Sequence, residues 1–136
     1  MPPQSPTPRL RRWIVSWGPA LAWATILFLL SELRTVPRVV TFANNDKLIH
    51  FGMYAVLGGL LAWGQHGQPI GRGHAAPLAA GYFYGAVDEL HQRFVPYRMP
   101  SWGDWTADVF GVSVGYTVVL LLLRALHGVR ARATRP

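Results

Sequence analysis

The chain has 136 residues, of which 51% are hydrophobic and only 14% are charged, and it contains no cysteine. A mean hydropathy of +0.20 is too high for an ordinary soluble domain, and without cysteine neither disulfides nor thiol chemistry is available. The formal net charge of +7 raises the question of a nucleic-acid partner. The arginines, however, flank apolar segments, which is typical of membrane proteins, and we predict no nucleic-acid binding.

Four segments are nearly free of charge: 13–31, 48–65, 75–87 and 105–123. Each is close to the roughly 20 residues that a helix needs to cross a bilayer, although the third reaches that length only if it includes residues 88–92. A helix that is apolar on all sides is a membrane span or the core of a much larger protein, and this chain is too short for the second. The sequence therefore predicts an all-α integral membrane four-helix bundle.

Basic residues predict the domain organisation and the orientation. Those on the predicted cytoplasmic side are Arg9, Arg11, Arg12, Arg72, Arg124, Arg130, Arg132 and Arg135, and those on the outer side are Arg34, Arg38, Lys47, Arg93 and Arg98. Cytoplasmic loops carry an excess of arginine and lysine, so we predict that both termini are cytoplasmic. We assign 1–12 to a disordered basic tail, 13–127 to a single four-span membrane domain and 128–136 to a basic C-terminal tail.

Polar residues and glycines recur at three- and four-residue steps in the last three segments. The three stripes are Asp46, His50, Tyr54 and Gly58; Gly81, Gly85, Asp88 and Gln92; and Asp104, Asp108, Gly111 and Gly115. Residues at this spacing share one face of a helix, and small residues there let helix backbones approach closely. We predict that the three stripes face one another and that the helices pack at Gly58, Gly81, Gly85, Gly111 and Gly115.

The polar ends of the three stripes fall on the outer side of the predicted topology. A charged residue at the bilayer centre costs roughly 2.5–3.5 kcal/mol on insertion scales, so such residues tend to mark functional sites. We predict an outward-facing pocket built from Asp46, Lys47, His50, Asp88, Glu89, Gln92, Arg98, Ser101, Asp104 and Asp108. The loop stiffened by Pro96 and Pro100 is expected to cross its mouth, with Arg98 and Ser101 available to an anion.

Several uses of these residues stay open. They can bind a cationic group, a metal or a lipid phosphate, or they can form an internal salt-bridge network that locks the bundle. Because the chain has no HxxxH or cysteine spacing, we favour pairing of His50 with a carboxylate, predict no metal site and name no cofactor. Ser101 follows Pro100 at an expected helix start, where serine caps the helix, so we name no catalytic residue and lean against an enzyme.

Two segments, NDKLIHFGMYAVLG and DELHQRFVPYRMPSWGDWTADVFGVSVG, resemble the VanZ-like family over roughly the last two-thirds of the chain. The family pattern is Asp-Lys-x-x-His-Phe, Asp-Glu-x-x-Gln, Arg-x-x-Ser-x-x-Asp and Gly-x-x-x-Gly. The matching positions are Asp46, Lys47, His50, Phe51, Asp88, Glu89, Gln92, Arg98, Ser101, Asp104, Gly111 and Gly115. One departure is Asp108, where many relatives carry asparagine.

The resemblance implies a multi-pass protein of the bacterial cytoplasmic membrane. The founding member of the family is associated with low-level resistance to teicoplanin, an antibiotic that acts on the outer side of that membrane. We therefore predict recognition of an envelope lipid or lipid-linked head group, with Arg98 and Lys47 at its phosphate. The alternative is a structural accessory subunit that docks against a larger membrane complex through apolar surfaces such as 26–30 and 120–123. The expected partners are membrane lipids and, under the alternative, protein subunits.

Overall fold

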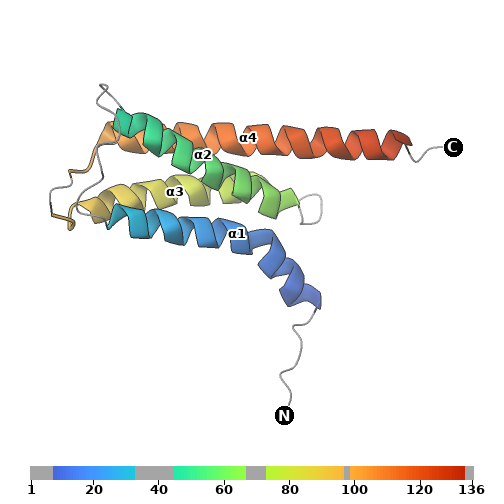
Figure 1. Cartoon of the computed structure of the whole chain (residues 1–136), viewed down its shortest axis with the longest axis horizontal. Coiled ribbons are helices and arrows are strands. Elements are labelled where there is room, and N and C mark those ends of the chain that lie inside the picture. The colour runs from blue at the N-terminus through green and yellow to red at the C-terminus, as the bar shows by residue number, and fades with distance from the viewer. Residues whose placement is uncertain (1–7, 33–44, 67–72, 97–98, 134–136) are drawn as a thin grey trace, which may run out of the picture.

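The computed structural model describes residues 8–32, 45–66, 73–96 and 99–133. These residues form four helices and no strand: α1 (Pro8–Ser31), α2 (Asn45–His66), α3 (Ala75–Gln92) and α4 (Trp102–Ala133) (Figure 1). Three stretches of them, Pro8–Ser31, Asp46–His66 and Trp102–His127, are long and apolar enough to cross a membrane. The predicted all-α membrane four-helix bundle is confirmed.

The helices extend beyond the predicted apolar segments. α1 begins at Pro8, so residues 8–12, which we assigned to a disordered tail, are helical, and proline suits the first turn because its missing N–H is not needed there. α4 continues to Ala133 through good helix formers, so residues 128–133 are helical as well. α3 has only 18 residues and carries Asp88 and Glu89, and its crossing of the membrane remains a prediction.

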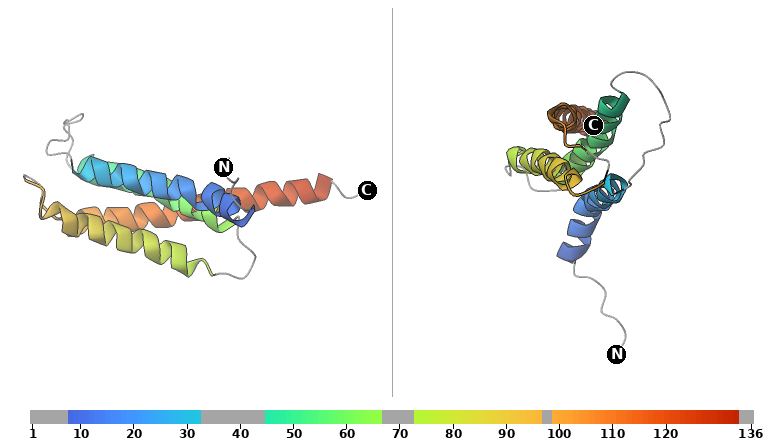
Figure 2. Two further views of the ribbon diagram at one scale, coloured as in Figure 1. Left: turned by 90° about the horizontal axis from the view of Figure 1, so that it is seen from below. Right: turned by 90° about the vertical axis from the view of Figure 1, so that its left-hand side faces the viewer.

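Helices α2 and α4 form the most closely packed pair of the bundle. Both α2 and α3 contact each of the other three helices, whereas α1 contacts α2 and α3 but not α4 in the described residues (Figure 2). The start of α1 and the end of α4 lie on the same side of the bundle (Figure 1). The start of α2, the end of α3 and the start of α4 meet at the opposite end.

The contact between α2 and α4 is a backbone contact made possible by glycine. A Cβ atom at Gly58 would collide with the backbone of Val112, and one at Gly115 would collide with the carbonyl oxygen of Ala55. Gly111 lies against the carbonyl oxygen of Phe51 in the same way. Backbone atoms cannot move aside as a flexible side chain can, so these positions have no room for a larger residue.

Helix α3 packs on this pair through its own two glycines. A Cβ at Gly81 would lie 2.8 Å from Val112 Cγ1, and one at Gly85 would lie 3.2 Å from Asp108 Cβ. The face of α3 that carries Asp88 and Gln92 is therefore turned toward α2 and α4, and both of these polar side chains are buried.

Helix α1 is attached to the bundle partly by hydrogen bonds between distant segments. Trp23 Nε1 donates to the Met53 carbonyl oxygen at 2.9 Å, and the Tyr84 hydroxyl donates to the carbonyl oxygen of Ala24. The helix is bent in its N-terminal part (Figure 1), and Pro19, which lies inside it, removes one backbone hydrogen bond. The bend turns the first turns of α1 away from the bundle.

Substitution of Gly58 by alanine is expected to lower the free energy of unfolding by about 1–3 kcal/mol, because the new methyl group must push the α4 backbone away. Gly52→Ala is the matched control on the same helix, since a Cβ at Gly52 meets nothing within 4 Å. The control should be neutral or slightly stabilising, because alanine favours helix more than glycine does. Thermal unfolding in detergent, followed by circular dichroism, measures the difference, and equal stability of the two variants would contradict the packing.

Candidate functional site

Six polar side chains from three helices are buried or half-buried together at one end of the bundle. We call them the polar cluster: His50 on α2, Asp88, Glu89 and Gln92 on α3, and Asp104 and Asp108 on α4. Of these, only His50 is more than slightly exposed. A set of buried ionisable groups in an otherwise apolar chain is the first place to look for a binding site.

The position of Glu89 is fixed through both of its carboxylate oxygens. Gln92 Nε2 donates to Oε1 at 3.3 Å, and the backbone N–H of Ser101 donates to Oε2 at 2.7 Å. Ser101 also accepts a hydrogen bond at its Oγ from the backbone N–H of Asp104 at 3.3 Å, so it caps the start of α4. The end of the loop and the first turn of α4 are therefore tied to α3.

Within the polar cluster, two side chains of α2 hold a buried carboxylate each, one on α4 and one on α3. His50 Nδ1 donates to Asp108 Oδ1 on α4 at 3.0 Å, and the Tyr54 hydroxyl donates to Asp88 Oδ2 on α3 at 3.2 Å. The two rings, one turn apart on α2, lie nearly parallel with an angle of 6° between their planes. These two bonds hold the two most deeply placed carboxylates.

Each of these carboxylates also has an oxygen without a partner. Asp88 Oδ1 and Asp108 Oδ2 are buried and accept no hydrogen bond within the described residues. Leaving a buried polar atom unpaired costs about 1–3 kcal/mol, and more when the group is charged. A ligand or a buried water molecule at this end of the bundle can satisfy these two oxygens.

Two residues predicted for the pocket lie at its rim. The Asp46 side chain is 60% exposed, because α2 begins at Asn45 and its first turn lies at the end of the bundle. Lys47 Nζ lies 3.2 Å from both Asp46 Oδ2 and Asp104 Oδ1, and its binding of a phosphate stays a prediction. Arg98, the other expected phosphate ligand, lies outside the described residues.

The balance of charge in the cluster is negative. It contains four carboxylates, and within the described residues the basic groups paired with them are Lys47 and His50. A site of this composition attracts cations more strongly than anions. A cationic group or a metal was among the ligands that the sequence left open for this pocket.

A cleft of about 700 Å³ lies beside the cluster, between the end of α3 and the start of α4. Its lining residues are Ala86, Glu89, Leu90, Arg93, Met99, Pro100, Ser101, Trp102 and Trp105. The sequence predicts Arg93 only as a basic residue on the outer side. Its spacing of four from Glu89, which puts both on one helix face, was the signal that could have placed it in the site.

A second cleft of about 770 Å³ lies between α1, α2 and α3 and is lined almost wholly by apolar side chains, among them Trp17 and Leu61. It contacts no member of the polar cluster. It therefore adds mostly apolar surface that lipid chains can cover, and its lining contains no charged side chain.

A model of the VanZ/LLP1 family matches residues 8–124. The chain belongs to this family. The match confirms the resemblance that rested on the last two-thirds of the sequence, and it extends the resemblance to α1. No curated protein and no solved structure matches the chain. For this VanZ/LLP1 protein, the chemistry of the site must be argued from its own residues.

Tyr54→Phe is expected to lower the free energy of unfolding by about 1–3 kcal/mol, because Asp88 loses its hydrogen-bond donor in a buried place. Tyr82→Phe is the matched control. The Tyr82 hydroxyl bonds Ser113 Oγ at 2.8 Å, but Ser113 keeps a second partner in the Val109 carbonyl oxygen, so a loss below about 1 kcal/mol is expected. Thermal unfolding of both variants in detergent provides the comparison, and a smaller effect at Tyr54 than at Tyr82 would refute this account of the cluster.

Proposed function

We propose that this VanZ/LLP1 protein recognises the polar head group of an envelope lipid or lipid-linked molecule. The observation that carries the proposal is the junction of the polar cluster with the cleft between α3 and α4, because Glu89 belongs to both. A ligand in this cleft reaches charged groups at one part of its surface and apolar groups at another. That combination fits an amphiphile better than a wholly polar solute.

The dimensions of the cleft support a head group rather than a whole lipid. Its volume of about 700 Å³ lies in the usual range of small-molecule sites, roughly 300–1,000 Å³. Apolar side chains continue at its edge, where Met99 is 84% and Trp102 83% exposed. Tryptophan is enriched where a membrane meets water, so the acyl or prenyl chains would extend from the cleft into the bilayer beside these residues.

The charges around the cleft suggest how the head group is oriented. Arg93 supplies a guanidinium that suits phosphate, and Arg98, five residues further along the chain, is proposed to assist it. Glu89 accepts hydrogen bonds from hydroxyl or amino groups of the head. In this arrangement Lys47 orients Asp104.

The location follows from the arginine distribution. With both termini in the cytoplasm, as the flanking arginines favour, the polar cluster faces the outer leaflet of a bacterial cytoplasmic membrane. Recognition of an envelope lipid there would give the protein a cell-envelope role, in keeping with the antibiotic response associated with the founding member of the family.

A bulky residue in the cleft should displace the bound lipid. We expect native mass spectrometry of protein extracted mildly from its own membranes to show a retained phosphate-containing lipid, and Ala86→Trp to reduce its occupancy at least tenfold by filling the cleft. Ala79→Trp is the matched control, because Ala79 is exposed on the same helix and lines neither cleft.

The control should keep the lipid at the wild-type level. Loss of lipid in both variants, or retention in both, would overturn the proposal. So would fixed partner subunits in place of any lipid, since that result belongs to an accessory subunit of a larger complex.

A further inference from the structure

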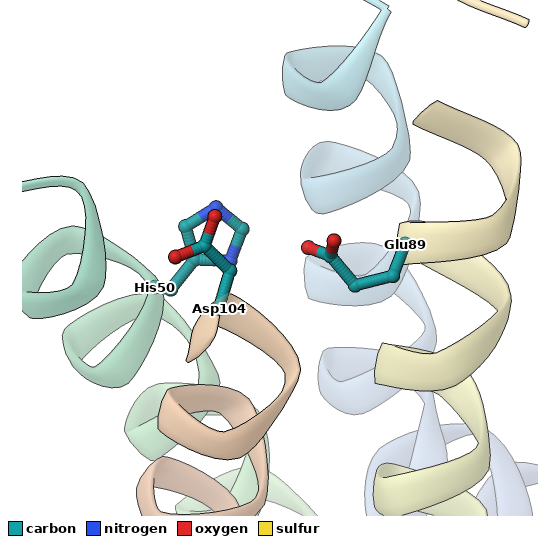
Figure 3. Close-up of side chains that lie close together, drawn as sticks. All are labelled: His50, Glu89 and Asp104. Carbon is teal, nitrogen blue, oxygen red and sulfur yellow. The ribbon is translucent and has the colours of Figure 1, made fainter. Parts of the chain in front are cut away.

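Three ligand atoms of a kind that binds metal ions converge from three different helices. His50, Glu89 and Asp104 each offer one such atom, and these atoms all lie within 4.8 Å of one another. Figure 3 shows the carboxylate of Glu89 pointing toward His50 and Asp104. Ligands about 2.1 Å from a common ion are at most about 4.2 Å apart, so a shift of roughly half an ångström closes the group around one ion. We propose that these three residues bind a divalent metal ion.

The hydrogen bond of His50 fits this role. Its Nδ1 donates to Asp108 Oδ1 at 3.0 Å, which fixes the ring and leaves Nε2 as the nitrogen with a free lone pair. A histidine that binds metal almost always donates its other ring N–H to a carboxylate or carbonyl oxygen. Asp108 is fully buried, so it is well suited to hold the ring in one orientation.

The two carboxylate ligands are held in place as well. Glu89 accepts from Gln92 and from the Ser101 backbone, and Asp104 accepts from Lys47. Each carboxylate has about four lone-pair sites, so these bonds leave room for a metal. Ligands whose positions are fixed before the ion binds lose little conformational entropy when it does.

The unpaired oxygens supply independent evidence for a cation. Asp108 Oδ2 has no partner among the described residues, and it lies 3.3 Å from the position of a Cβ on Gly85, one turn before Glu89 on α3. Asp88 Oδ1, on the residue that precedes Glu89 in α3, is also buried and unpaired among the described residues. Four carboxylates against Lys47 and His50 leave negative charge in a place with little water, and a divalent cation would neutralise it.

The ligand set indicates the class of ion. One imidazole nitrogen and two carboxylate oxygens suit Mn²⁺ or Zn²⁺, whereas Ca²⁺ takes six to eight oxygen ligands. Three protein ligands leave coordination positions open. Because Glu89 also lines the cleft, a phosphate oxygen of the head group can occupy an open position; this step, unlike the metal site itself, rests on the function proposed above.

Binding of Mn²⁺ to the purified full-length chain in detergent tests the site directly. Electron paramagnetic resonance of free Mn²⁺ should show one tightly bound ion per chain, and competition with Zn²⁺ should release it. Glu89→Gln and Asp104→Asn should each weaken binding at least about tenfold. The metal should also raise the Tm of the wild type but not of these variants, and the Tm of the metal-free variants shows whether they fold.

Matched controls come from the same end of the bundle. Glu32→Gln removes a surface carboxylate that lies 2.6 Å from His91, and Asp46→Asn removes one that is 60% exposed. Both should leave Mn²⁺ binding unchanged. Absence of binding, or an equal loss in Glu32→Gln and Glu89→Gln, would overturn the metal site.

The metal proposal and the head-group proposal can be contradicted independently of each other. If the protein binds no metal and keeps its lipid in a chelator, the metal site is wrong and the head-group proposal stands. If metal binds but Ala86→Trp leaves the lipid unchanged, the metal site stands and the head-group proposal is wrong.

Discussion

The backbone contact between α2 and α4 is the constraint on which the site depends. Both helices start at the same end of the bundle, so they run parallel. The register that seats Gly115 on Ala55 also sets His50 beside Asp108, two turns of α4 nearer the polar end, and Lys47 beside Asp104, one turn beyond that. A helix is rigid over this length, so close packing in the apolar middle fixes distances in the polar cluster several turns away.

This dependence explains how much of the fold the sequence could predict. Apolar segments and glycine spacing identify the four helices, and the helical period puts Asp104, Asp108 and Gly111 on one face. The same period puts Asp46 on the face of His50. Asp46 lies one turn closer to the helix end, however, where the bundle no longer covers it, and its side chain is 60% exposed. Periodicity predicts the direction in which a side chain points. It does not predict where the neighbouring helices end, and therefore whether the side chain is buried.

The rest of the site could not be predicted because it arises between helices. Nothing in the spacing shows that α2 packs most closely on α4, or that His50 meets Asp108 while Tyr54 meets Asp88. A motif such as HxxxH puts metal ligands on one segment, whereas the proposed ligands come one from each of three helices. The ion pair of Lys47 with Asp104 likewise depends on the register of α4 relative to α2, which the sequence of α2 alone cannot predict.

The charge of the cluster is better explained by binding than by stability. Replacing a buried ionic network with apolar residues of similar volume is often neutral or stabilising, and the glycine contacts already hold α2, α3 and α4 together. Asp108 shows this most clearly, because its hydrogen bond with His50 does not need a charged group. An asparagine at this position could accept the His50 hydrogen bond through its amide oxygen, so the structural role does not require an acid. A carboxylate adds a full negative charge next to the imidazole, which makes the ring a stronger ligand and the site more attractive to a cation.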